Sequence, residues 1–218
     1  MNENPNLNPQ NGESDEAVAI EKKPEKKPAE QQSKGYLFDY FEMIGVALLL
    51  VLFLFTFCFR TARVDGPSMN NTLVHGELLV TSNLFYEPEV GDIVVFHLCN
   101  DAYNHPIVKR VIAKEGQDVR IDITVGEVYV DGQLVDEPYA YLDTGYYSAN
   151  GYFDYNRLYT APNGHTVFMT TVPEGTLFVM GDNRNHSSDS RSAAIGFVDE
   201  DCILGKAVLR FKPFTVFH

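Results

Sequence analysis

Basic side chains are scarce in this chain. Its 218 residues contain 17 Lys and Arg against 30 Asp and Glu, which gives a formal net charge of -13 at pH 7. Recognition of nucleic-acid phosphates needs clustered Lys and Arg, so this balance argues against a nucleic-acid partner. The apolar fraction of 44% is ordinary for a folded protein, and the length suits one medium domain with appendages.

Cysteine is also scarce, and three cysteines cannot form an even disulfide framework. Cys58 lies in an apolar run, which leaves Cys99 and Cys202 as the two that could pair. Two free, buried thiols are the simpler expectation, and a disulfide is the alternative. The six histidines show no zinc-ligand spacing, although His97 and His105 flank Cys99. We therefore expect no metal site and no organic cofactor.

Long apolar runs are absent except for one. Residues 43–59 are 17 positions without a charge, and residues 36–41 can extend the run to about 20, enough to cross a hydrocarbon core of roughly 30 Å. The sequence therefore predicts a transmembrane helix over residues 36–60. A cleaved signal peptide is the competing interpretation, but its charged region would be unusually long and no small-x-small site follows Phe59.

The segment before this run, residues 1–35, has too few aliphatic side chains to offset the entropy cost of ordering, so we expect a disordered tail. Its five lysines outnumber Arg60 and Arg63, the basic residues between the run and Lys109. Cytoplasmic flanks of membrane helices carry an excess of Lys and Arg. This asymmetry predicts a single-pass protein of the cell membrane with a cytoplasmic N-terminus and an extracytoplasmic domain over residues 61–218.

Helical periodicity is missing beyond residue 60. Short β-rich runs alternate there with Gly, Asp and Asn, and Asp131-Gly132 predicts a tight turn between two of them. The fold class is therefore mainly β behind a single N-terminal transmembrane helix. The predicted strands are Glu77–Thr81, Asp92–Phe96, Ile107–Ala113, Val119–Thr124, Glu127–Val130, Thr176–Met180 and Ile203–Phe211.

One stretch of this domain, residues 139–160, holds seven tyrosines among Gly and Asn residues. A surface loop or irregular hairpin is the simpler interpretation. Because tyrosine is amphipathic, contact with a membrane interface or with substrate is the functional alternative.

Two residues suggest chemistry. Ser68 lies shortly after the apolar run, and Lys109 lies 41 residues later in an apolar run that is typical of a strand. A serine hydroxyl is a poor nucleophile until a base takes its proton. Lysine can be that base only if its pKa falls from about 10.4 toward neutrality, and burial among Ile and Val would lower it. Taken singly, Ser68 would be a turn serine and Lys109 an edge-strand lysine. Together they predict a Ser-Lys hydrolase held close to a membrane.

Four motifs occur in order along the chain, in residues 64–73, 91–96, 108–113 and 181–198. They read Gly-Pro-Ser-Met with Thr-Leu following, Gly-Asp-Ile-Val-Val-Phe, Val-Lys-Arg-Val-Ile-Ala, and Gly-Asp-Asn-Arg with Asp-Ser-Arg and Gly-Phe-Val downstream. With the preceding apolar run, they resemble the type I signal peptidases, in their Gram-positive-like form, across residues 43–212. Those enzymes are membrane-anchored serine proteases that remove signal peptides from exported proteins. One motif alone would be weak, but four in order are specific.

The resemblance implies roles for individual residues. Ser68 would be the nucleophile, Lys109 the general base, and the backbone N–H of Ser68 the oxyanion donor. Some members add a serine hydroxyl two residues earlier, where this chain has Gly66, as members from Gram-positive bacteria usually do. The second donor therefore stays open, and a glycine also suits a close approach beside a nucleophile.

Further positions match residues that support the site in the family. Ser187 matches a position whose hydroxyl can hold the base lysine, and Met69 would pack under the nucleophile and keep the base dry. Asp182, Asp189 and Arg191 match residues that brace the site. Arg191 with Asp189 could form a charge-assisted pair.

The chain departs from the family pattern in two places. Asn71 replaces a common proline, which removes a rigid turn element but no catalytic group. The segment from Ser192 to Ile195 is slightly longer than usual, which we expect to reshape a loop beside the site. Two Asn-x-Ser/Thr sequons, at Asn70 and Asn185, fall inside the motifs, where a glycan would block substrate. That placement favours a bacterial cell.

By resemblance, the substrates would be secretory preproteins bound in extended form along a strand edge, beside the lipid bilayer. Cleavage would follow a small residue, usually Ala, with a second small residue two positions earlier. A peptidase dedicated to pilin-like substrates is a narrower alternative, for which residues 139–160 would supply contacts. An inactive membrane-anchored adaptor is another, but it would gain nothing from Ser68 and Lys109. A self-cleaving repressor would need a DNA-binding segment, and a penicillin-binding enzyme would need Lys where Asn71 stands.

Overall fold

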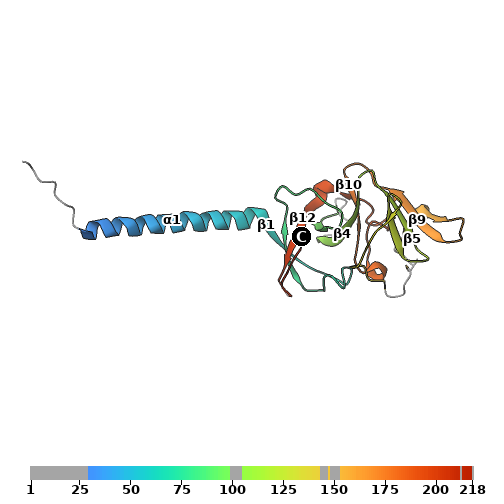
Figure 1. Ribbon diagram of the computed structural model, residues 1–218, viewed down its shortest axis with the longest axis horizontal. Coiled ribbons are helices and arrows are strands. Elements are labelled where there is room, and N and C mark those ends of the chain that lie inside the picture. The colour runs from blue at the N-terminus through green and yellow to red at the C-terminus, as the bar shows by residue number, and fades with distance from the viewer. Residues whose placement is uncertain (1–28, 99–104, 143–146, 148–152, 212, 218) are drawn as a thin grey trace, which may run out of the picture. The chain divides into compact units, whose positions relative to one another are not determined.

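The computed structural model combines one long helix with two antiparallel sheets, so the mainly β prediction is confirmed (Figure 1). Helix α1 (Ala29–Cys58) begins inside the segment predicted as a tail, and its stretch Tyr36–Cys58 is long and apolar enough to cross a membrane. The first part of the predicted tail, residues 1–28, lies outside the described residues. The structure describes residues 29–98, 105–142, 147, 153–211 and 213–217.

The larger sheet has eight strands in the order β1-β2-β12-β3-β4-β10-β11, and β13 pairs with β12. Strand β1 begins directly after α1, and its first residue, Phe59, pairs with Ser82 of β2. The helix ends at Cys58, two residues before the predicted boundary at residue 60, and the aromatic start of the strand continues the apolar run. The strands are β1 (Phe59–Arg63), β2 (Leu78–Ser82), β3 (Ile93–Phe96), β4 (Ile107–Lys114), β10 (Thr176–Met180), β11 (Val198–Asp199), β12 (Ile203–Arg210) and β13 (Thr215–Val216).

The smaller sheet has five strands in the order β7-β6-β5-β9-β8. Asp131 and Gly132 join β6 to β7 with φ of 51° and 77°, so the predicted tight turn is confirmed. Both residues of such a turn need positive φ, which Gly and Asp tolerate best. The strands are β5 (Asp118–Asp122), β6 (Glu127–Val130), β7 (Gln133–Leu134), β8 (Leu158–Thr160) and β9 (Thr166–Thr171).

The seven strands expected from the sequence correspond to β2, β3, β4, β5, β6, β10 and β12, with ends shifted by at most a few residues. Strand β9 was missed because its threonines break the apolar pattern. Strands β11 and β13 are too short to produce a pattern. Three short 3-10 helices complete the described elements, at Tyr155–Arg157, Arg184–His186 and Glu200–Cys202.

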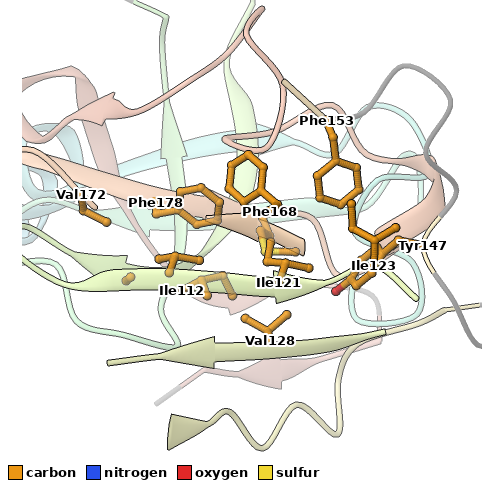
Figure 2. Packing of buried hydrophobic residues seen from close by; sticks show 12 residues of the cluster. Ile112, Ile121, Ile123, Val128, Tyr147, Phe153, Phe168, Val172 and Phe178 are labelled. Carbon is orange, nitrogen blue, oxygen red and sulfur yellow. The ribbon is translucent and has the colours of Figure 1, made fainter. Parts of the chain in front are cut away.

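The core that joins the two sheets is aromatic and β-branched (Figure 2). The ring of Phe168 on β9 lies 5.6 Å from that of Phe153 and 6.0 Å from that of Phe178 on β10. Strand β4 contributes Ile112 to the same cluster and then continues into β5 of the smaller sheet. Because β4 is fixed on both sides, the residues it carries have little freedom to move.

One residue of the tyrosine-rich stretch belongs to this core. Tyr147 is 2% exposed and packs edge-on against Phe153, with ring centroids 5.7 Å apart. Tyr155 and Tyr159, by contrast, are exposed. Residues 143–146 and 148–152 lie outside the described residues.

The cysteines differ from the simpler expectation. Cys202 is disulfide-bonded, which corrects the expectation of a free thiol there, and Cys58 is free. Cys99 lies outside the described residues. Three cysteines without a spacing motif do not distinguish a free thiol from a disulfide, so the sequence alone could not predict the state of Cys202.

Candidate active site

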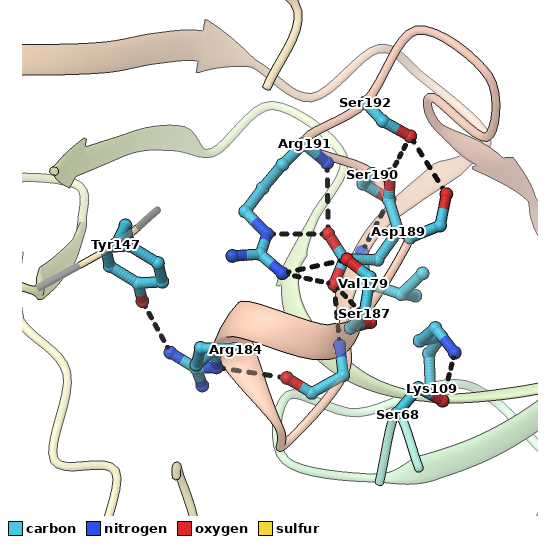
Figure 3. A network of polar contacts seen from close by, with 12 residues as sticks. Ser68, Lys109, Tyr147, Val179, Arg184, Ser187, Asp189, Ser190, Arg191 and Ser192 are labelled. Carbon is cyan, nitrogen blue, oxygen red and sulfur yellow. Dashed lines mark hydrogen bonds and ion pairs between the residues drawn. The ribbon is translucent and has the colours of Figure 1, made fainter. Parts of the chain in front are cut away.

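Ser68 and Lys109 lie in direct contact. Ser68 is in the segment between β1 and β2, and Lys109 is on β4. The Lys109 Nζ donates a hydrogen bond to Ser68 Oγ at 2.8 Å (Figure 3). It donates a second one to the Val108 carbonyl at 2.9 Å. The serine segment is fixed by the buried side chains of Met69 and Leu73 and by a hydrogen bond of 2.8 Å from Leu73 N to the Met69 carbonyl.

Lys109 is buried without a carboxylate partner. Its side chain leaves the residue 3% exposed, and no ion pair reaches it within the described residues. Burial lowers the pKa of Lys109 from 10.5 to about 8, while the charge of Asp189 raises it and that of Arg191 lowers it further. An amine with this pKa is partly neutral near pH 8, as a general base must be.

A cavity of about 170 Å³ opens beside the two residues. Ser68 and Lys109 line it, and Asp65, His105 and Ser188 add polar groups. The remaining walls are mainly apolar. They consist of Val64, Met69, Pro106, Ile107, Val108 and Ile195. Met69 lines this cavity together with Ser68 and Lys109 and is 1% exposed.

Two buried ion pairs lie next to this contact. Arg191 binds Asp189 through two hydrogen bonds, of 2.7 and 2.8 Å, and both side chains are 0% exposed. Burial alone would raise the pKa of Asp189, but the charge and hydrogen bonds of Arg191 outweigh it and hold that pKa below its ordinary value. Arg110 binds Asp182 in the same two-pronged way, at 2.9 and 2.7 Å. Such pairs fix geometry because the planar guanidinium matches a carboxylate.

Ser187 belongs to the first of these pairs. Its hydroxyl donates to Asp189 Oδ2 at 2.7 Å, and within the described residues Lys109 donates to Ser68 and Val108 instead. Within the described residues Ser187 therefore makes no hydrogen bond to Lys109, which is the contact that the resemblance implied. Ser187 also packs on Gly181, where an added Cβ would collide with the Ser187 side chain and lie 2.5 Å from the Ser68 carbonyl oxygen.

Three supporting residues had no role in the sequence analysis. Asn183 donates its backbone N–H to the Ser68 carbonyl at 3.0 Å and its side-chain amide to the Pro67 carbonyl at 3.1 Å. The next residue, Arg184, is buried and binds Glu137 and the Tyr147 hydroxyl. Asn183 and Arg184 were inside a recognised motif. Glu137 had no local signal, because its partner lies 47 residues away.

Gly66 has a backbone role that a serine would not share. Its φ of 84° lies in the left-handed region, which favours glycine. Its N–H points to His75 Nδ1 at 3.1 Å, and the same ring nitrogen lies 3.2 Å from Asp65 Oδ1. Gly66 supplies no hydroxyl to the site, so a second oxyanion donor from this position is excluded.

Residues 37–212 match the family model described as signal peptidase, peptidase S26. This chain belongs to the signal peptidase S26 family. Membership makes it a serine endopeptidase of the signal peptidase type, hence a hydrolase.

Several known proteins are similar to this chain. A protein named probable signal peptidase I-1 from Synechocystis is 36% identical over 180 residues, covering 78% of this chain and 80% of that protein. Signal peptidase IB from Staphylococcus aureus is 33% identical over 188 residues, covering 84% and 94%. A crystal structure of a signal peptidase I from Enterococcus faecalis matches 56% of this chain and 97% of its own, at 27% identity and a TM-score of 0.41.

Proposed function

We propose that this chain removes signal peptides from secretory preproteins through a Ser68-Lys109 dyad. The observation that carries the proposal is the 2.8 Å contact between the Ser68 hydroxyl and a buried lysine amine whose pKa is lowered to about 8. A binding module would have no use for a desolvated, unpaired lysine, because burying it is unfavourable. The same geometry is what an activated nucleophile requires.

The reaction follows from these two groups. Neutral Lys109 takes the proton of Ser68 as Oγ attacks the scissile carbonyl and forms a tetrahedral intermediate. That proton then passes to the leaving amine, the peptide C–N bond breaks, and an ester joins Ser68 to the signal peptide. Lys109 next takes a proton from water, the resulting hydroxide attacks the ester, and the proton returns to Ser68 Oγ.

The oxyanion needs a fixed donor, and the Ser68 N–H is positioned to serve. Within the described residues this N–H donates to no protein group. The other end of the same peptide group, the Pro67 carbonyl, accepts a hydrogen bond from the Asn183 side-chain amide at 3.1 Å. A peptide group held at one end keeps its other end oriented, so Asn183 would position the oxyanion donor without touching substrate.

The proposal includes the membrane. Helix α1 would anchor the chain by its stretch Tyr36–Cys58, with residues 1–35 cytoplasmic and the peptidase domain, residues 61–218, outside the cytoplasm. Anchoring enzyme and signal peptide in one bilayer raises their effective concentration. The lysines ahead of the helix support this orientation.

The test is cleavage of a preprotein with Ala at positions -1 and -3 by the detergent-solubilised full-length chain. Ser68→Ala should abolish cleavage, with a loss of at least about 10³-fold in kcat, because no second nucleophile is available. Ser82→Ala, a hydroxyl deletion on β2 away from the cavity, should cut like the wild type. Sequencing the product should place its new N-terminus directly after the -1 Ala.

Two results would contradict the proposal. Cleavage by Ser68→Ala at the wild-type rate would show that Ser68 is not the nucleophile. Binding of the preprotein by the wild-type chain without cleavage would favour the adaptor interpretation.

A further inference from the structure

The segment from Ser192 to Ile195, which the sequence marked as longer than usual, forms a closed turn. The Gly196 N–H donates to the Ser192 carbonyl at 2.9 Å, and Gly196 has a φ of 63°. Ala193 and Ala194 on this turn are exposed, whereas Ile195 is only 7% exposed. The turn therefore directs one large side chain inward and leaves two small ones outside.

The turn is hydrogen-bonded to Asp189, a member of the buried Asp189–Arg191 ion pair beside the active site. Ser192 donates both its N–H and its hydroxyl to the Asp189 carbonyl, at 2.9 and 3.0 Å (Figure 3). Asp189 is itself locked by the buried Arg191. Ile195 is consequently fixed relative to the catalytic groups rather than carried on a free loop.

Ile195 lines the cavity that contains Ser68 and Lys109. It also packs in the core cluster with side chains of β3, β4 and β10, and it lines a second cavity, of about 230 Å³, together with Leu98, Val198 and Cys202. Ile195 is therefore part of the wall of both cavities, and its position is fixed by the turn that is hydrogen-bonded to Asp189 and by the core cluster in which it packs. The volume available beside the nucleophile therefore depends on the size of this side chain.

We propose that Ile195 is a specificity-determining residue, whose side chain limits the size of the substrate side chain that can enter the cavity beside Ser68. The inference rests on the proposed function and names the residue that enforces its preference for small side chains. In an extended substrate, alternate side chains point to the same side. The limit set by Ile195 therefore acts at position -1 or -3 and leaves position -2 unaffected.

The experiment compares cleavage of preproteins carrying Ala, Val or Leu at position -1, -2 or -3 by the full-length enzyme in detergent. Ile195→Ala should raise kcat/KM for Val at -1 or -3, relative to Ala, by about tenfold or more, since one methylene in a pocket changes discrimination by about 10- to 200-fold. Ile195→Val should give a smaller change in the same direction. The ratio within each variant is the readout, because lost stability would lower both rates together.

Ile203→Ala is the matched control. Ile203 is also 7% exposed and belongs to the same core cluster, but it does not line the cavity. Its Val-to-Ala ratio should equal that of the wild type at every position.

Three outcomes would overturn the inference: an unchanged ratio in Ile195→Ala, an equal change in Ile203→Ala, or a change confined to position -2. If Ile195→Ala does not fold, Ile195→Val decides, and an unchanged ratio there overturns the inference as well. Failure of the proposed function looks different, because the wild type would then not cut the substrate with Ala at -1 and -3.

Discussion

Two buried cations lie close together in this protein and have opposite surroundings. Arg191 is 0% exposed and meets the Asp189 carboxylate through two hydrogen bonds. Lys109 is 3% exposed and meets a hydroxyl and a carbonyl. Burial with a counter-charge holds an ion in its charged form, whereas burial without one favours the neutral form. The comparison shows how one region can combine a rigid frame, the Asp189–Arg191 ion pair, with an amine of lowered pKa, that of Lys109.

Removing the unpaired cation should have the largest effect. Lys109→Met keeps a long apolar side chain in the cavity but deletes the base, so we expect kcat to fall by about 10³-fold or more. Lys114→Met, at the other end of β4, is the control and should keep nearly full activity. Steady-state cleavage of the preprotein measures both. If Lys109→Met cut at the wild-type rate, the lysine would be structural like its arginine neighbours.

Removing the counter-charge of the paired cation should cost stability. Asp189→Ala leaves Arg191 buried and alone, and we expect the free energy of unfolding to fall by about 3–5 kcal/mol, measured by urea unfolding in detergent. Asp136→Ala, an exposed acid, should change it by less than about 0.5 kcal/mol. Replacing both partners, by Asp189→Leu with Arg191→Met, should recover part of the loss.

The same pair sets a pH dependence of stability. Because the pKa of Asp189 is depressed in the folded state, its contribution is complete above the unfolded-state pKa of about 3.9 and is lost as pH falls below it. The double substitution should flatten this acid limb. An acid limb unchanged by the double substitution would show that other carboxylates cause it.

The unpaired cation sets a pH dependence of activity with the opposite requirement. In the proposed mechanism Lys109 must be neutral to act, and its pKa is about 8. The rate should therefore rise with pH and level off above about pH 8, falling about tenfold for each unit below that, so that pH 6 gives about 100-fold less activity. A pH profile of kcat/KM measures it. A rate that fell between pH 6 and 8 would mean that the charged amine is the active form.

The smallest effect should come from disturbing the close approach of Gly181 to Ser187 and to the Ser68 carbonyl. At Gly181 an added Cβ would lie 2.5 Å from the Ser68 carbonyl oxygen and collide with Ser187. Gly181→Ala should therefore shift Ser68 and lower kcat by about 10- to 100-fold, since small displacements of reacting groups are costly. Gly45→Ala, where nothing lies within 4 Å of the added Cβ, should have no effect. Equal losses in both would show that the close contact is unimportant.

The contact between Ser68 and Lys109 was predicted from the sequence more completely than the ion pairs beside it. Ser68 and Lys109 were paired because the chemistry of each requires the other, and apolar neighbours on β4 announced the burial. Most strands were also predicted, because alternation and turn residues are local signals. The bond of Asn183 to Ser68 and that of Glu137 to Arg184 were not, since each joins segments whose approach depends on packing of the whole domain.

Side-chain partners within recognised motifs were equally hard to predict. Ser187 was expected to contact the lysine, but its hydroxyl donates to Asp189, only two residues along the chain. Competition between two nearby acceptors is decided by small differences in orientation, and a sequence carries no information about these. Cys202 illustrates the same limit, because pairing depends on which segments meet.

Helix α1 passes directly into β1, and this limits which scissile peptide bonds Ser68 can reach. Strand β1 is hydrogen-bonded to β2 along its whole length, so little slack remains between Cys58 and Ser68. These residues are about ten positions apart, which limits their separation to roughly 35 Å even for a fully extended chain. With α1 as the anchor, the cutting point has a maximum height above the bilayer. On the proposed anchoring, the enzyme would reach only cleavage sites that lie within this distance of the membrane, so it would select substrates by the height of the scissile bond as well as by sequence.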